Sequence, residues 1–335
     1  MMERKKINWL LILQGWAMLW VIIGHSYLGI VNVGPTWENL LVKIAYSFHM
    51  PLFMLVSGWL FFLTRLSTIN PSWGGQKWTY GRIIIDKSLR LLLPGFVFSL
   101  LALVLKLAFP GEMSRQVGLS LRDIAHQYLY PNDNPMRELW FIATLFWFFL
   151  LTPFWNVVLK KNWVMWVTII VLTVLHFWHP NIQFLCIDRA FEYAIWFFLG
   201  LFVFKMNFIE NVLVKRVYLV LIVGVMIYIM GLYSLKFITT MGGIVFSFAF
   251  AIIADKYIPK LFIGFRNYTY QIFLMGIFAQ IAVKIIYRHV NMPYILVFLL
   301  CVVAGIYVPV IVSKILQKIN CRFLLLCAGL NKKKK

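Results

Sequence analysis

Long apolar segments, separated by shorter polar ones, recur along the whole chain. A helix needs about 20 apolar residues to cross a membrane, so each run of that length is a candidate span. Two longer polar pieces lie at about 65–89 and 110–137, and the second predicts a short helix near 119–130. The pattern predicts ten spanning helices, at about 7–32, 39–64, 90–109, 138–159, 163–180, 190–207, 215–235, 237–255, 268–287 and 292–316.

Composition places the chain among integral membrane proteins. Of its 335 residues, 62% are hydrophobic and 13% are charged, whereas a soluble domain is nearly half apolar and a quarter charged. The expected fold class is all-α, a polytopic membrane helical bundle forming one integral-membrane domain over 1–335. Its motifs lie in the half 1–160, followed by C-terminal helices at 161–320 and a basic tail at 321–335.

The net charge of +21 follows membrane topology and does not indicate nucleic acid. Basic residues concentrate in cytoplasmic loops, where they contact anionic lipid headgroups. With the N-terminus inside, most of the 32 Lys and Arg residues fall in inner segments, which predicts a cell-membrane protein with both termini cytoplasmic. The predicted inner residues are Arg4, Lys5, Lys6, Arg65, Lys77, Arg82, Lys87, Arg90, Lys160, Lys161, Lys205, Lys215, Arg216, Lys256, Lys260, Arg266, Lys314, Lys318, Arg322 and 332–335. The predicted outer residues are Arg115, Arg122, Arg137, Arg189, Lys236, Lys284 and Arg288.

The chain ends and the cysteines add no further chemistry. The basic segment 1–6 precedes an apolar run without a small-residue cleavage site, which favours an uncleaved first helix. The lysine run 332–335 is expected to be a solvated, lipid-facing anchor. No metal is expected, because metal or redox spacing is missing from the four cysteines, Cys186, Cys301, Cys321 and Cys327.

The first apolar helix carries two polar side chains, Gln14 and His25. They are eleven residues apart, which at 3.6 residues per turn is close to three full turns. Both side chains therefore emerge from one face, about 16 Å apart along the axis. A polar stripe on a membrane helix is expected to face protein or a water-filled cavity. The stripe predicts a polar site within the membrane.

The second helix repeats this feature with His49. His25 lies about seven residues, and His49 about ten, from the predicted outer ends of their helices, which places them at similar depth. Pro51 is expected to free a backbone carbonyl and bend the helix just past His49. Ser57-Gly58 is expected to allow the close approach of another helix.

Two interpretations of these histidines are open at this point. A lone intramembrane histidine can simply bond a neighbouring helix. An imidazole, with an ordinary pKa of about 6.5, can also accept and return a proton at neutral pH. The matched depth of His25 and His49, with Gln14 on the same stripe, favours chemistry.

These residues resemble the acyltransferase-3 superfamily of membrane O-acyltransferases, in particular its fucose 4-O-acetylase-like branch. The stretch from Gln14 to His25 is similar to the family signature of an arginine, ten residues and an essential histidine. The most specific similarity is to the second-helix motif, in Phe48-His49-Met50-Pro51-Leu52-Phe53 followed by Ser57-Gly58. The segment 87–94 is similar to the family's third-helix entry and 139–141 to the start of its fourth helix, and a weaker similarity is found at 197–200.

The chain departs from the family pattern at two places. Gln14 stands where the signature has an arginine, so a role that needs a fixed positive charge there is in doubt. Glutamine still donates and accepts hydrogen bonds. The ninth helix carries Ile-Phe-Leu-Met-Gly at 272–276, where many relatives have a histidine, so no catalytic role is carried over to it.

The resemblance implies transfer of an acyl group, most simply acetyl, from cytoplasmic acyl-CoA to a hydroxyl of an extracytoplasmic or lipid-linked glycan. His25 is expected to be the general base or a transient acyl carrier, and Glu138 is the preferred partner for orienting a histidine. Independently, the inner loop offers basic side chains for donor phosphates, although the same residues also suit a purely topological role. The expected catalytic residues are His25, His49 and Glu138; donor or oxyanion positioning falls to Gln14, Ser57, Lys87 and Arg90; acceptor binding falls to Arg137, Trp140, Arg189 and Glu192.

Two other classes of function are open. A glycan or lipid transporter also has many helices and a polar stripe, but the chain shows no duplicated half and almost no mid-span acids. A non-catalytic accessory subunit is open because of Gln14. At the outer mouth, Trp140 also fits a simple interfacial role, and Arg137 and Arg189 also fit simple ion pairs with nearby acids.

Overall fold

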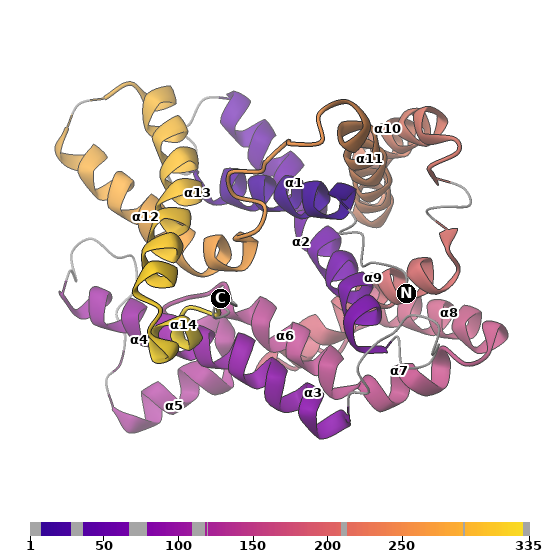
Figure 1. Cartoon of the computed structure of the whole chain (residues 1–335), viewed down its shortest axis with the longest axis horizontal. Helices are drawn as coiled ribbons and strands as arrows, with labels where there is room; N and C mark the ends of the chain where they lie inside the picture. Colours follow the sequence, from indigo (N-terminus) through magenta and orange to yellow (C-terminus); the bar gives the residue numbers. More distant parts are fainter. Residues whose placement is uncertain are drawn as a thin grey trace. The chain divides into compact units, whose positions relative to one another are not determined.

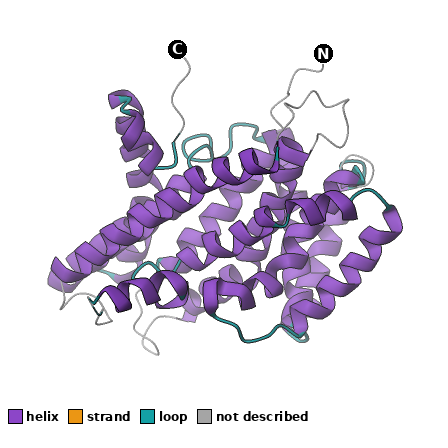
Figure 2. Ribbon diagram, turned by 90° about the horizontal axis from the view of Figure 1, so that it is seen from below, coloured by secondary structure: helices purple, strands orange, loops and turns teal. Residues whose placement is uncertain are grey.

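The structure is a computed structural model that describes residues 8–27, 36–66, 79–108, 118, 120–208, 213–290 and 292–330. All regular secondary structure in this part of the chain is helical (Figure 2). The predictions that lie outside the described residues concern 1–6, Lys77, Arg115 and 332–335.

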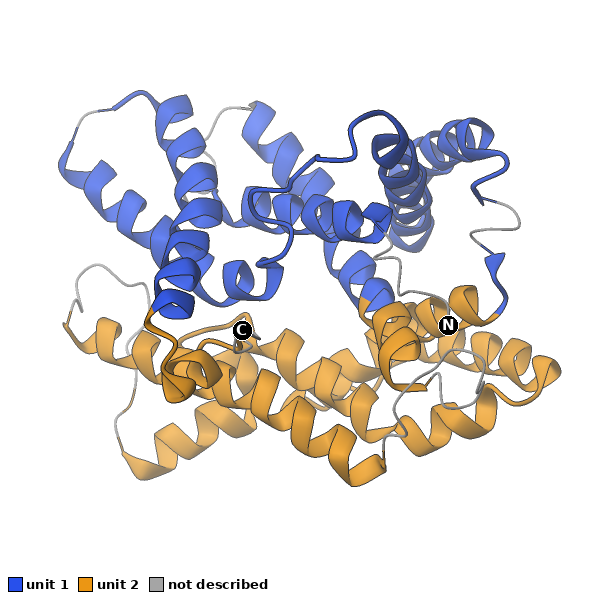
Figure 3. Cartoon of the chain, in the orientation of Figure 1, with its two compact units in different colours: residues 1–56, 206–318 blue, residues 57–205, 319–335 orange. Residues whose placement is uncertain are grey.

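The chain divides into two units, coloured separately in Figure 3. Unit 1 comprises residues 1–56 and 206–318, and unit 2 comprises residues 57–205 and 319–335. The boundary falls inside α2 (Thr36–Phe61). Besides the first part of α2, unit 1 holds α1 (Asn8–His25), α10 (Val217–Leu232), α11 (Lys236–Tyr257), α12 (Thr269–His289) and α13 (Tyr294–Ile319), as labelled in Figure 1.

Unit 2 contains the rest of α2 and a series of shorter helices. The predicted short helix near 119–130 is present as α5 (Leu121–Leu129) and begins with a capping box between Ser120 and Asp123. The other elements of unit 2 are η1 (Phe62–Leu66), α3 (Tyr80–Lys87), η4 (Ser88–Leu92), α4 (Leu93–Ala108), α5 (Leu121–Leu129), η5 (Pro131–Asp133), α6 (Leu139–Leu150), α7 (Thr152–Val158), α8 (Asn162–Phe177), η6 (Phe184–Cys186), α9 (Ile187–Lys205) and α14 (Arg322–Cys327).

Each of the ten predicted ranges contains helix, and the all-α membrane class is confirmed. The count of ten spans stays a prediction, because α8 and α10 have only 16 residues each and α9 carries several charged residues. Within the described residues, six helical segments are long and apolar enough to cross a membrane, or seven if the bent pair α6–α7 is one span. The six are Asn8–His25, Trp37–Leu66, Tyr80–Ala108, Lys236–Tyr257, Thr269–His289 and Tyr294–Ile319.

The predicted inner loop at 65–89 is wrong over residues 80–89. Helix begins at Tyr80 and continues through η4 into α4, ten residues before the predicted start. The hydroxyl of Thr79 accepts a hydrogen bond from the backbone N–H of Arg82 and caps the first turn. Asp86 then pairs with both Arg65 and Arg90, which offsets their charges. The hydropathy pattern predicted a loop here because it treats each charged residue as unpaired.

The predicted helix 138–159 is also wrong as a single element. It is broken at Leu151 into α6 and α7, which are bent by 55°. Pro153 stands in the first turn of α7, where a proline is tolerated because its missing N–H needs no partner there. The helix interior would not accept it without a kink.

In unit 1, α10 and α11 form a tight hairpin. A Cβ atom at Gly224 would lie 2.7 Å from the backbone nitrogen of Phe246, and one at Gly231 or Gly242 would also meet backbone of the opposite helix. Small residues let membrane helices approach to backbone contact. The packing continues to α1, because Trp16 donates a hydrogen bond to Ser247 over 3.1 Å.

Candidate functional site

The rings of His25 and His49 both lie against Tyr46 in unit 1. The Tyr46 ring centroid is 6.1 Å from that of His25 and 5.1 Å from that of His49, edge-on in both cases. Close packing of the two helices fixes this arrangement, since a Cβ at Gly24 would lie 3.3 Å from the Tyr46 ring. The structure therefore brings together the two histidines predicted from the sequence. His49 is 1% exposed, whereas His25 is half-buried.

His49 is held in one orientation by its own helix. Its Nδ1 lies 2.5 Å from the carbonyl oxygen of Ala45. A carbonyl only accepts, so Nδ1 carries a proton and donates it. In neutral His49 the other ring nitrogen, Nε2, is then an acceptor.

Pro51 frees a carbonyl in the turn before it, as predicted. A proline lacks the N–H that would bind the carbonyl four residues earlier, which is that of Ser47. The hydroxyl of Thr240 in α11 donates to the Ser47 oxygen over 2.7 Å and takes that place. The Ser47 hydroxyl also lies 3.1 Å from that of Tyr228 in α10. The turn that carries Tyr46 and His49 is therefore tied to the α10–α11 hairpin.

Helix α1 ends at His25, seven residues before the predicted end, and Ser26 and Tyr27 are not helical; residues 28–32 of the prediction lie outside the described residues. His25 consequently occupies the last turn rather than a position seven residues inside. The reason is a set of donors from α12: Lys284 Nζ donates to the carbonyls of His25, over 2.9 Å, and Tyr27, over 2.6 Å. The Gln280 amide donates to the Ile22 carbonyl, over 2.9 Å. These bonds satisfy carbonyls that a helix end leaves without intrahelical partners.

Replacing Lys284 by methionine is expected to loosen the end of α1. The change removes a charged donor from two carbonyls, each bond being worth about 1.5–3 kcal/mol. Amide hydrogen exchange over residues 22–27 should become faster. The control is Arg288→Met, one turn further along α12, where the side chain is exposed. Equal exchange in the two variants would show that the helix end does not depend on Lys284.

Sequence reasoning missed several residues of this region. Glu38 is fully buried in the first turn of α2 and accepts a hydrogen bond from Tyr294 of α13. It stands just before the predicted second span, where a charged residue is ordinary. Tyr46 could have been found from its spacing, since residues three apart share a helix face. Nothing in the sequence around Gln280 and Lys284 indicates their contacts with the end of α1.

Gln14 is half-buried in the interior of α1, beside Gly15. A Cβ on Gly15 would lie 3.2 Å from the Cβ of Arg266, so a buried arginine does approach this part of α1. Its guanidinium donates to Asn8 over 2.8 Å and to the carbonyl of Pro259 over 3.0 Å. Arg266 therefore holds the first turn of α1 and does not replace the arginine that the signature would place at position 14.

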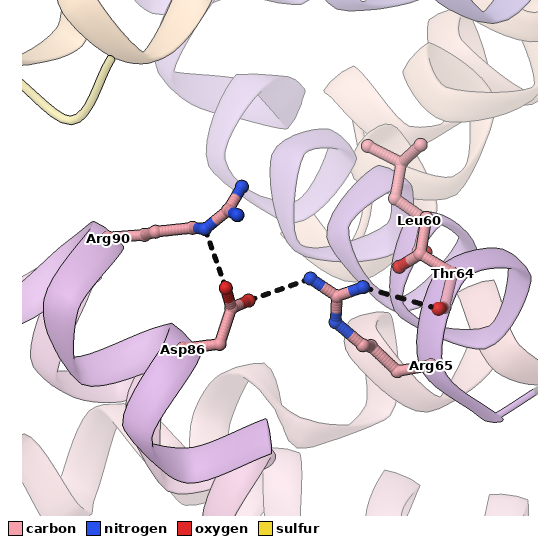
Figure 4. A network of polar contacts seen from close by, with 5 residues as sticks. All are labelled: Leu60, Thr64, Arg65, Asp86 and Arg90. Atoms are coloured by element: carbon pink, nitrogen blue, oxygen red, sulfur yellow. Dashed lines mark hydrogen bonds and ion pairs between the residues drawn. The ribbon is translucent and has the colours of Figure 1, made fainter. Parts of the chain in front are cut away.

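The predicted donor-positioning residues Lys87 and Arg90 lie in unit 2, at the junction of α3 and η4. The Lys87 ammonium sits 4.3 Å from the ring centroid of Phe149. Arg90 Nε donates to Asp86 over 2.7 Å, and Arg65 binds the other oxygen of the same carboxylate at the same distance (Figure 4). Ser57 is half-buried in α2, next to Gly58. Arg90 keeps half of its side chain exposed, at 49%.

Three of the four predicted acceptor-binding residues form one cluster in unit 2. Arg189 pairs with Glu192 over 2.8 Å and lies 5.5 Å from the Trp140 ring centroid. The pairing of Arg189 with a nearby acid is therefore present. Arg137 is exposed, and Glu138 is half-buried at the N-terminus of α6. Glu138 belongs to unit 2, whereas His25 and His49 belong to unit 1.

One comparison with known proteins gives a result. Curated proteins and solved structures show no significant match to the chain. The family model Acyl_transf_3, described as an acyltransferase domain, matches residues 7–314. This match covers nearly all of the described residues, including both histidines, and the chain belongs to this acyltransferase family.

Proposed function

We propose that the protein is a multi-pass membrane O-acyltransferase that moves an acetyl group from acetyl-CoA to a hydroxyl of a glycan or lipid-linked sugar. The observation that carries this proposal is the pair of histidines around Tyr46 on the first two helices of a chain in an acyltransferase family. The fucose 4-O-acetylase-like branch is the part of that family that the motifs resemble most.

The proposed reaction needs one proton acceptor and no redox partner. His25 takes the proton of the acceptor hydroxyl as the oxygen attacks the thioester carbonyl. A carbon–oxygen bond forms, the carbon–sulfur bond breaks, and the departing thiolate receives the proton as free CoA. In the alternative, His25 first takes the acetyl group on a ring nitrogen and then passes it to the hydroxyl.

The fixed orientation of His49 limits its role. With Nδ1 bonded to Ala45, neutral His49 presents only an acceptor at Nε2. It then suits orienting a hydroxyl or accepting a proton. Stabilising an oxyanion would require the protonated ring, because an oxyanion needs a donor.

The proposal assigns the other predicted residues to the donor and to the acceptor. Lys87 and Arg90 supply positive charge for the phosphates of CoA. Trp140 offers an aromatic face to a sugar ring, and Arg189 and Glu192 offer a donor and an acceptor to its hydroxyls. A buried oxygen of Asp188, beside Arg189, has no hydrogen-bond partner among the described residues and would accept a sugar hydroxyl. The predicted cell-membrane location, with cytoplasmic termini, places the donor inside.

Acyl turnover separates this function from a transporter and from an accessory subunit. Membranes with and without the protein are supplied with acetyl-CoA labelled in the acetyl group. We expect label to appear in the glycan or lipid-sugar fraction as an alkali-labile ester, with one free CoA thiol per ester. Neither rival forms an ester, so unlabelled glycans and lipids in the presence of folded protein would contradict the proposal.

A further inference from the structure

A pocket of about 230 Å³ lies in unit 2 between the α3–η4 junction and the C-terminal segment. One wall comes from Asp86, Leu89 and Arg90, and the other from α14 and the residues after it. The C-terminal wall is formed by Arg322, Leu325, Leu326, Gly329 and Leu330. The pocket therefore joins the basic segment after α3 to a part of the chain that the proposed reaction does not use.

The lining of this pocket carries more positive than negative charge. Asp86 is the one acid in its lining, and both of its oxygens are occupied by Arg65 and Arg90. Arg90 uses only its Nε in this pair, and Figure 4 shows the two terminal nitrogens pointing away from Asp86. Arg322, across the pocket, is exposed. A guanidinium with its terminal N–H groups directed outward matches the oxygens of a phosphate.

The remaining lining is apolar. Leu89, Leu325, Leu326 and Leu330 surround the two arginines, and Leu325 and Leu330 are buried. A simple inorganic anion gains nothing from such a lining, whereas a phosphate joined to an apolar group fills both parts of the pocket. The residues therefore favour an amphiphilic ligand.

We propose that this pocket binds a phosphate group attached to an apolar portion, with Arg90 and Arg322 holding the phosphate and the leucines covering the apolar part. Two sources carry this chemistry: CoA and an anionic phospholipid. The CoA source deepens the proposed function and rests on it, because it assigns α14 to the donor site. The phospholipid source is independent of the reaction.

The test compares Arg322→Gln with two other variants of the full-length protein in phosphatidylcholine nanodiscs. Leu326→Trp fills the pocket without changing charge, and Lys318→Gln removes an exposed lysine, four residues before Arg322 in the sequence, that does not line the pocket. Free CoA is titrated by calorimetry, and the melting midpoint is measured with and without added phosphatidylglycerol. Loss of one charged contact should weaken binding about tenfold.

Weaker CoA binding in Arg322→Gln and Leu326→Trp, with Lys318→Gln unchanged, supports the proposal and identifies CoA as the ligand. Unchanged CoA binding, with loss in the same two variants of the rise in melting midpoint caused by phosphatidylglycerol, supports the proposal and identifies the phospholipid as the ligand. Wild-type behaviour of both variants toward both probes overturns it. The binding assays are repeated in His25→Ala, so a failure of acyl transfer and a failure of the pocket are separate results.

Discussion

Replacing His25 by alanine is expected to lower the rate of acyl transfer by about 10²–10⁴-fold, the usual contribution of a positioned general base. The loss should appear in kcat rather than in CoA binding, because the imidazole acts on the hydroxyl proton and not on the donor. The measurement is the initial rate of label transfer from acetyl-CoA in membranes with matched amounts of folded protein.

The matched control is His289→Ala, which removes an exposed histidine at the end of α12 and should keep full activity. His49→Ala should also reduce transfer, and the ratio of the two losses separates base from orienting group. Incubation without acceptor distinguishes the alternative, since an acyl carrier leaves label on the protein. Full activity in His25→Ala would remove His25 from the mechanism.

Gly58→Ala is expected to cost at least about 3 kcal/mol of stability, the upper end for overpacking. A Cβ at Gly58 would overlap the backbone carbonyl of Phe197 in α9. Backbone cannot move aside as a side chain does, so α2 and α9 must separate. The melting midpoint should fall by about 6 °C or more, at about 2 °C per kcal/mol for a large domain.

Gly81→Ala is the matched control. Gly81 lies in α3, and nothing lies within 4 Å of a Cβ placed on it. Alanine is favoured over glycine in a helix by about 1 kcal/mol, so this variant should melt at the same temperature or slightly higher. Equal melting of the two variants would mean that the contact of Gly58 with Phe197 does not stabilise the protein.

The sequence predicted where helices lie better than where they end. Apolar runs are long and unambiguous, so all ten ranges contain helix. Helix ends depend on partners that are distant in the chain. The helix that begins at Tyr80 is stabilised by ion pairs of Asp86 with Arg65 and Arg90. Helix α1 ends at His25, whose carbonyl accepts a hydrogen bond from Lys284. Hydropathy contains no term for either contact.

Some residues of the candidate site could likewise be predicted from the sequence, and others could not. His25 and His49 could be found because a polar residue in an apolar run is conspicuous, and Gly58 because small residues in an apolar helix allow another helix to approach. Glu38 and Lys284 could not, because they lie at the edges of predicted spans, where polar residues are ordinary. Their significance comes from contacts with Tyr294 and with the end of α1, more than 250 residues away in the sequence.

Helix α2 carries His49 on one side of the unit boundary and Gly58 on the other. Nine residues at 100° each bring these two positions to opposite faces of the helix. The angle between these two positions about the axis of α2 is therefore set by the number of residues between them. An insertion of one residue between them would turn His49 by about 100° about the helix axis relative to Gly58, although every side chain of α2 would still be present.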